Sequence, residues 1–187
     1  MTTTRTARVL VSVTALALLW SLTGCTGSPS DNRPSDNRPS GNPKETPLAT
    51  RKQADVAATL KTYGQATATL LGAPLENWAT APAPCEGPGG ALTTDGRFDM
   101  TGNANIAVPA GQHIASLQKL RDQWKQQGYE ITEYRTFPPD NTRGTVSARN
   151  PADNITISAQ STAPPQAFAL LIATPCYHPA PGETPTG

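Results

Sequence analysis

The chain has 187 residues, with 15 Lys or Arg against 14 Asp or Glu and a formal net charge of +1. Because the charges are balanced and no basic stripe is present, nucleic acid is an unfavoured partner. The length suits one folded domain with accessory segments.

The first 24 residues have the parts of a bacterial export signal. Arg5 and Arg8 form a positive start, and an apolar run follows over residues 9–22. This run is shorter than the roughly 20 residues that span a bilayer. The signal closes with Leu-Thr-Gly-Cys at residues 22–25, which resembles the lipobox of bacterial lipoproteins. The resemblance implies cleavage before Cys25, acylation of its thiol by diacylglycerol carrying fatty acids such as palmitate, and anchoring on the outer face of the cell membrane.

The chain contains three cysteines, Cys25, Cys85 and Cys176. If Cys25 carries lipid, an even pair remains in an oxidising compartment, and we expect a disulfide bond between Cys85 and Cys176. Closing a loop of about 90 residues stabilises a fold by roughly 4–5 kcal/mol in chain-entropy terms. The alternatives are an ordinary secreted protein in which Cys25 pairs with another cysteine, or two free thiols. A metal site is not expected, because no further ligand lies at a suggestive spacing.

Residues 25–48 read as a lipidated cysteine followed by a disordered spacer. Large apolar side chains are scarce there, and the motif Ser-Asp-Asn-Arg-Pro occurs twice in succession. Such a segment buries too little surface to offset its ordering entropy. Its roughly 23 residues would reach about 70 Å if fully extended. The repeated arginines could bind anionic cell-wall polymer, but the aspartates beside them cancel that charge, so we interpret the segment as a spacer.

Residues 49–178 are expected to form a single domain with two helices. Apolar residues recur at alternating steps of four and three within residues 49–71, which predicts a helix with one buried face. Thr50 with Gln53 is a plausible capping box at its start. A second helix is predicted over residues 111–127. A glycine directly follows each helix, where a left-handed residue commonly ends one.

The remaining patterns indicate strands. Residues 73–90, rich in Pro and Ala, are interpreted as a loop, and residues 179–187 as a disordered tail. The run 168–173 is continuously apolar, which is typical of a central strand covered on both faces. The fold class is therefore α+β, an antiparallel sheet of about five to six strands with two helices on one face and one disulfide. Strand-like segments lie at residues 91–100, 103–108, 129–137, 144–149, 154–161 and 168–174.

The order of these features resembles the small cell-envelope lipoproteins of high-GC Gram-positive bacteria, of the actinobacterial type. The likeness lies in the lipobox, the polar linker, a Trp-to-Cys loop (Trp78, Pro84, Cys85), a helix followed by a meander, and a late Pro-Cys pair (Pro175, Cys176). The resemblance implies an envelope location and carries over no catalytic residues.

The sequence contains no recognisable catalytic set. His113 is expected at the surface or as a helix cap, and His178 is expected to be exposed; neither belongs to a Ser/His/Asp pattern. The glycines of residues 87–90 do not form a phosphate loop. Glu130 and Glu133 suit solvated strand edges better than a glycosidase pair. We therefore expect neither an enzyme nor a cofactor.

Two hypotheses for the function follow. The first is a non-catalytic module that binds an envelope protein or a cell-wall component. The alternative is a carrier of a small ligand or lipid, with an apolar cavity between the helices and the sheet. Candidate lining residues are Trp78, Trp124 and Tyr134, although aromatic side chains more commonly fill a core. Trp78 is expected to pack near the disulfide.

Overall fold

The computed structural model describes residues 47–184. The predicted signal, the lipobox with Cys25 and nearly all of the spacer lie outside these residues. In the described part of the chain, neither helix is long and apolar enough to cross a membrane.

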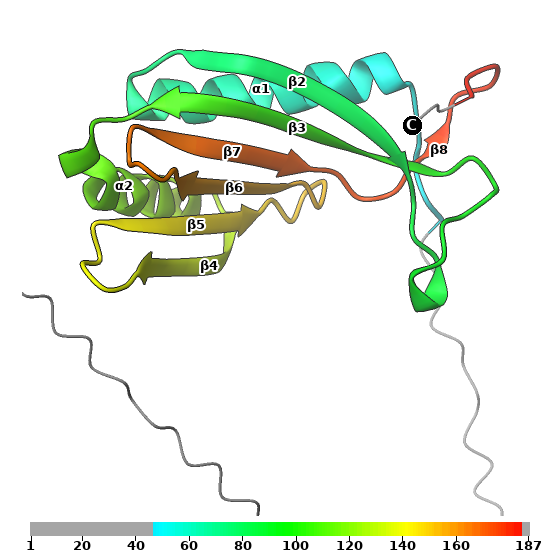
Figure 1. Cartoon of the computed structure of the whole chain (residues 1–187). Coiled ribbons are helices and arrows are strands. Elements are labelled where there is room, and N and C mark those ends of the chain that lie inside the picture. Colours follow the sequence, from blue (N-terminus) through cyan, green and yellow to red (C-terminus); the bar gives the residue numbers. More distant parts are fainter. Residues whose placement is uncertain (1–46, 185–187) are drawn as a thin grey trace, which may run out of the picture. The chain divides into compact units, whose positions relative to one another are not determined.

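Six strands form one antiparallel sheet in the order β2-β3-β7-β6-β5-β4, and both helices pack on the same face of it (Figure 1). The predicted α+β class is confirmed. Each helix is followed along the chain by a pair of antiparallel strands: α1 by β2 and β3, and α2 by β4 and β5. Strands β7 and β6 pair with each other at the centre of the sheet. In chain order the elements are β1 (Thr50–Arg51), α1 (Gln53–Leu71), β2 (Leu75–Pro84), β3 (Phe98–Ala107), α2 (His113–Gln126), β4 (Glu130–Phe137), β5 (Arg143–Arg149), β6 (Thr156–Ser161), β7 (Ala167–Ala173) and β8 (His178–Pro179), with short 3-10 turns at Pro88–Gly90 and Ala110–Gln112.

Helix α1 ends as predicted but begins differently. The residue at its N-cap is Lys52, which makes no side-chain cap bond. Instead the backbone N–H of Gln53 donates to Oε2 of Glu183 at 3.1 Å. The capping box predicted for Thr50 is therefore wrong, since the carboxylate at the helix N-terminus comes from the far end of the chain, where it also suits the helix dipole. At the other end, Gly72 adopts the left-handed conformation, with φ of 72°.

Strand β2 replaces the loop that we predicted at residues 73–90. Pro82 and Pro84 pair with Met100 and Phe98 of β3. Proline cannot donate to a ladder, so it is tolerated in a sheet mainly at an edge, and β2 is an edge strand. The Pro- and Ala-rich composition therefore predicted a loop where an edge strand forms.

Strand β3 is a single strand where the sequence predicts two short strands, at residues 91–100 and 103–108, or one broken hairpin. Residues 98–106 pair with β2 on one side, with an irregularity between Glu76 and Ala79, and residues 101–107 pair with β7 on the other. The break expected around residues 101–102 does not occur, because Thr101 and Gly102 pair with both neighbouring strands. The indole ring of Trp78 packs on Gly102.

The C-terminal segment is ordered further than predicted. His178 is exposed, as expected, and starts β8, which pairs in parallel with β1. The His178 N–H donates to the carbonyl of Ala49 at 3.0 Å, and the Ala180 N–H donates to that of Arg51 at 3.2 Å. The predicted disordered tail is therefore wrong for residues 179–184.

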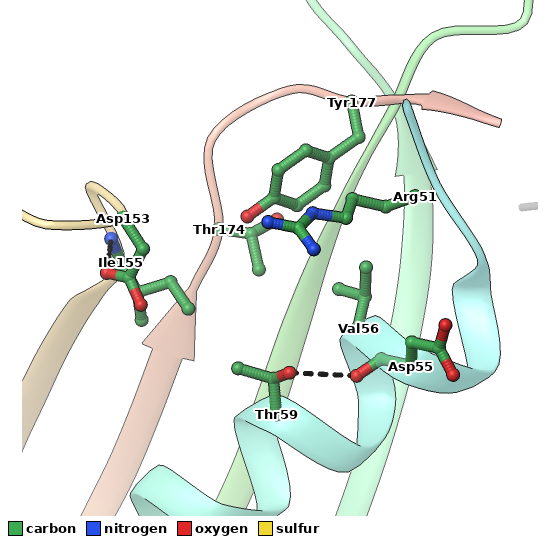
Figure 2. Close-up of a pocket in the computed structure, with 8 residues that line it drawn as sticks. All are labelled: Arg51, Asp55, Val56, Thr59, Asp153, Ile155, Thr174 and Tyr177. Atoms are coloured by element: carbon green, nitrogen blue, oxygen red, sulfur yellow. Dashed lines mark hydrogen bonds between the residues drawn. The ribbon is translucent and has the colours of Figure 1, made fainter. Parts of the chain in front are cut away.

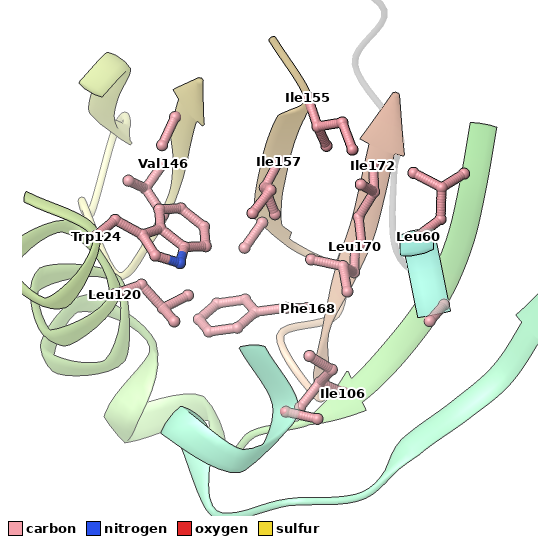
Figure 3. Packing of buried hydrophobic residues seen from close by; sticks show 14 of the residues in the cluster. Leu60, Ile106, Leu120, Trp124, Val146, Ile155, Ile157, Phe168, Leu170 and Ile172 are labelled. Atoms are coloured by element: carbon pink, nitrogen blue, oxygen red, sulfur yellow. The ribbon is translucent and has the colours of Figure 1, made fainter. Parts of the chain in front are cut away.

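The core lies between the sheet and the helices (Figure 3). Helix α2 contributes Leu117, Leu120 and Trp124 and helix α1 contributes Val56 and Leu60, all of them on the faces predicted from periodicity. Burying each large apolar side chain contributes about 1.5–3 kcal/mol. The sheet adds, as fully buried side chains, Phe98, Ile106, Ile157, Phe168, Leu170 and Ile172.

His113 belongs to this core, so the expectation of a surface or capping histidine is wrong. Its side chain is 0% exposed, and its ring lies edge-on to Phe168 with 4.7 Å between centroids. Nε2 lies 2.9 Å from the Val108 carbonyl oxygen, so Nε2 carries the proton and donates it. Within the described residues, Nδ1 has no hydrogen-bond partner.

Strand β7 is central but is not covered on both faces as predicted. Phe168, Leu170 and Ile172 are buried, whereas Ala169 and Leu171 between them point to the open face, with Leu171 45% exposed. The apolar run thus alternates between core and surface, since Ala and Leu occupy the exposed positions.

The predicted disulfide is confirmed. Cys85 and Cys176 are bonded to each other, with 6.0 Å between their Cα atoms and a separation of 91 residues. The bond joins the end of β2 to the segment that follows β7.

Candidate functional site

The aromatic residues predicted to line a ligand cavity do not come together. Trp124 is 1% exposed in the core. Trp78 lies on β2 and Tyr134 on β4, which are the opposite edges of the sheet. Five strand spacings separate these edges by roughly 24 Å. The predicted common site is therefore wrong.

Each of the two edge aromatics has a packing role instead. The six-membered part of the Trp78 indole lies against Gly64 of α1 and Gly102 of β3. It does not pack near the disulfide, because the extended strand carries the backbone of Cys85 roughly 23 Å beyond it. The ring of Tyr134 lies under the Arg121 guanidinium, whose Cζ is 4.6 Å from the ring centroid.

A small polar pocket lies where the start of α1 meets the end of the sheet (Figure 2). Its volume is about 90 Å³. It combines residues from the start of α1, from the turn between β5 and β6, and from the segment after β7. The lining residues are Arg51, Asp55, Val56, Thr59, Asp153, Ile155, Thr174 and Tyr177.

Asp153 is held in this pocket by a network that reaches α1. Its Oδ2 accepts a hydrogen bond from the Tyr63 hydroxyl at 2.6 Å, and its Oδ1 accepts from the Ile155 N–H at 3.1 Å. The same hydroxyl accepts from Nδ2 of Asn150 at 2.5 Å. Burial, and next the hydrogen bond to Asp153, hold the pKa of Tyr63 well above its usual value. The phenol therefore stays protonated and works as a fixed donor to the carboxylate.

Tyr177 and Arg51 form the opposite wall. Tyr177 is fixed by two backbone hydrogen bonds with Phe98, of 3.0 and 2.7 Å. Burial raises the pKa of Tyr177, the charge of Asp153 raises it further, and the charge of Arg51 lowers it, so both charges act on this phenol. Among the residues that the structure describes, the Arg51 guanidinium has neither an ion-pair nor a hydrogen-bond partner. It is thus available to a ligand.

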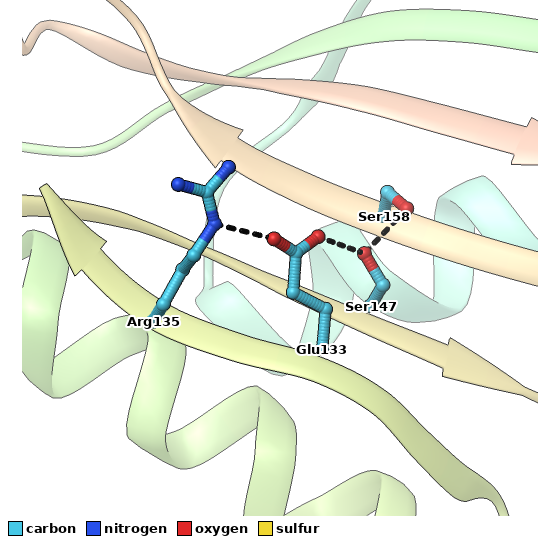
Figure 4. A network of polar contacts seen from close by, with 4 residues as sticks. All are labelled: Glu133, Arg135, Ser147 and Ser158. Carbon is cyan, nitrogen blue, oxygen red and sulfur yellow. Dashed lines mark hydrogen bonds and ion pairs between the residues drawn. The ribbon is translucent and has the colours of Figure 1, made fainter. Parts of the chain in front are cut away.

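The open face of the sheet carries the acidic residues that the sequence suggested for strand edges. Glu133 accepts hydrogen bonds from Nε of Arg135 at 2.5 Å and from the Ser147 hydroxyl at 3.5 Å, and Ser147 in turn bonds Ser158 at 2.7 Å (Figure 4). Glu130 accepts from Arg149 at 2.6 Å. Each glutamate thus has an arginine partner, as charges at the edge of a sheet commonly do.

A third polar group surrounds the disulfide. One carboxylate oxygen of Asp99 and the sulfurs of Cys85 and Cys176 lie within 4.8 Å of one another. Because the sulfurs are bonded to each other, they are not thiolate ligands in this state. Burial, and then the charge of Glu86, raise the pKa of Asp99.

Comparison with known proteins assigns no residue of these sites: no protein family, no curated protein and no solved structure matches this chain. The polar pocket is the candidate site, because it brings an unpaired cation, a fixed carboxylate and several hydroxyls together. None of its lining residues was selected from the sequence. They come from three separate segments, so no motif spacing could identify them.

Proposed function

We propose that this protein is a membrane-anchored, extracytoplasmic lipoprotein whose folded domain is a non-catalytic binding module of the cell envelope. The observation that carries the proposal is the disulfide between Cys85 and Cys176. Such bonds persist in oxidising compartments, which agrees with export. The bond also leaves Cys25, at the end of the lipobox, as the cysteine available for acylation.

Binding is favoured over catalysis by the chemistry around the pocket. A general base of the usual kind is a histidine within hydrogen-bond reach of its target. His113 lies in the core bonded to Val108, and His178 is exposed on β8. The pocket itself offers charges and hydroxyls, which suit recognition of a polar group.

The carrier alternative is less well supported. Two larger pockets, of 410 and 370 Å³, have a size that suits small ligands. The first is lined by residues of β2, β3 and the β6–β7 turn, and the second by the start of α2 and the turns that follow β4 and β6. Among these lining residues only Ile114 has a large apolar side chain. A lipid carrier would need an extended apolar lining between the helices and the sheet, where Trp124 and its neighbours are packed.

The proposal is tested by fractionation and metabolic acyl-labelling of a Cys25→Ala variant. We expect the variant to leave the membrane fraction and to incorporate no labelled fatty acid. The matched control is Cys176→Ala, which removes a different cysteine and should keep both the label and the membrane fraction. Retention and labelling of Cys25→Ala would refute the anchor.

A further inference from the structure

The candidate pocket has hydrogen-bond donors on one side. The Arg51 guanidinium and the Tyr177 hydroxyl lie together there, with the side chain of Thr174 beside them (Figure 2). Oγ1 of Thr174 accepts a hydrogen bond from the Met100 N–H at 3.0 Å, so its own proton remains free to be donated. These groups suit the two oxygens of a carboxylate.

Acceptors lie on the other side of the pocket. Thr59 donates its hydroxyl proton to the carbonyl of Asp55 at 2.9 Å, which leaves the lone pairs of its oxygen as acceptors. Each oxygen of Asp153 receives one hydrogen bond, and a carboxylate oxygen can accept a second. These groups suit an ammonium ion.

The space between the two sides is small and partly apolar. Val56 and Ile155 are 5% and 1% exposed and supply its apolar surface. The volume of about 90 Å³ is far below that of sites for drug-sized ligands. Only a compact molecule or the end of a larger one fits.

We propose that this pocket binds a small zwitterion of the α-amino-acid type. Its carboxylate lies on Arg51 and Tyr177, its ammonium group lies on Asp153, and its short side chain contacts Val56 and Ile155. The Asp55 carboxylate points away from Arg51, Tyr177 and Asp153 (Figure 2), so the charges that face the pocket are those of Arg51 and Asp153. A simple anion would be repelled by Asp153, and a simple cation would be repelled by Arg51. A zwitterion satisfies both charges at once.

The inference deepens the proposed role as a binding module and rests on it. A free amino acid and the zwitterionic end of a γ-glutamyl-type side chain in a peptide present the same chemistry. The two sources differ in the side chain: that of a free amino acid such as alanine ends, whereas that of the γ-glutamyl group continues into a peptide bond. Alanine and γ-glutamylglycine are therefore suitable probes for telling them apart.

The test is a ligand-observed NMR titration of the full chain, purified in mild detergent. We expect saturable binding of alanine, with acetate and ethylamine binding at least tenfold more weakly. Arg51→Gln should weaken alanine binding at least tenfold, and Tyr177→Phe, which keeps the ring, should weaken it several-fold. The matched control is Lys52→Gln, an exposed neighbour outside the pocket with the same charge change, which should stay within twofold.

Several results would overturn the inference. The first is that alanine shows no saturable binding up to about 50 mM, a concentration well above a millimolar dissociation constant. The second is that acetate binds as tightly as alanine. The third is that Arg51→Gln and Lys52→Gln weaken alanine binding equally. Tighter binding of γ-glutamylglycine than of alanine assigns the peptide source, and the reverse assigns the free amino acid. Failure here is distinguishable from failure of the proposed anchor, because acyl-labelling of Cys25 does not depend on the pocket.

Discussion

Replacing Gly102 by alanine should destabilise the domain by about 1–3 kcal/mol, the usual range for overpacking a core. A Cβ at Gly102 would lie 2.4 Å from Cη2 and 3.0 Å from Cζ2 of Trp78. Unstrained carbon atoms contact at about 3.5–4.0 Å. The indole, a rigid ring, must therefore retreat by about 1 Å from the sheet.

A double-mutant cycle with Trp78→Leu tests this origin directly. Without the indole the added methyl has room, so Gly102→Ala should be nearly neutral in the Trp78→Leu background. The free energy of unfolding is measured by urea titration with far-UV circular dichroism, which does not depend on the tryptophan removed. If Gly102→Ala changes the free energy of unfolding by the same amount in both backgrounds, within about 0.5 kcal/mol, the two sites are independent and the reasoning is refuted.

Gly64 provides a second arm of the same test. Its added Cβ would lie 2.9 Å from Cζ3 of Trp78 and 3.1 Å from Cδ2 of Leu75. Because Gly64 lies inside α1, alanine would also gain about 0.8–1.0 kcal/mol of helix propensity. Gly64→Ala should therefore be more favourable in the Trp78→Leu background than in the native chain. An equal effect in both would contradict the contact.

Three further predictions concern polar groups and the disulfide. Asp99→Asn should stabilise the domain at neutral pH, because the folded state raises the pKa of Asp99 above its usual 3.8 and so disfavours the ionised carboxylate. The stability gained by the substitution should be full above the raised pKa of the folded state and should vanish below 3.8, where the carboxyl is protonated in both states. Thermal unfolding measured against pH checks this. Removing both Cys85 and Cys176 by alanine substitution should lower the free energy of unfolding by about 2–5 kcal/mol, measured by urea titration. Tyr63→Phe should lower it by about 1.5–3 kcal/mol, since Asp153 loses the donor that reaches it from α1.

These predictions have controls with a defined sign. Asp95 is exposed, and its hydrogen bond with Arg97 lowers its pKa, so Asp95→Asn should change stability at neutral pH in the opposite direction to Asp99→Asn. The same sign for both variants would contradict the account of Asp99. A reducing agent should reproduce the cysteine substitutions and leave the substituted chain unchanged. For Tyr63→Phe, an unchanged unfolding free energy would show that the hydroxyl contributes nothing net.

Periodicity predicted the elements that bury one face. The helix stripes that contain Leu60 and Trp124 follow the 3.6-residue repeat, and the segments of β4, β5, β6 and β7 are bounded by turn residues, so their positions are nearly right. Strand β2 was missed because proline at an edge and proline in a loop give the same composition. The burial of His113 was missed because it depends on contacts with Val108 and Phe168, and the Phe168 ring lies far away in the sequence.

The candidate site could not be predicted from spacing. Arg51, Asp153 and Tyr177 lie in segments that come together only through the pairing of β1 with β8 and the turn between β5 and β6. The disulfide could be predicted, because interpreting Cys25 as the lipobox cysteine left Cys85 and Cys176 as one possible pair. The capping role of Glu183 could not, because nothing local links it to the start of α1.

The central claim is that one cysteine anchors the protein and the other two close its fold. It is tested most directly by mass spectrometry of peptides from the membrane-extracted chain, digested without reduction. We predict one peptide that begins at Cys25 and carries diacylglycerol, and another in which Cys85 is linked to Cys176. An unmodified peptide that continues through residues 24 and 25, or a disulfide involving Cys25, would contradict the claim.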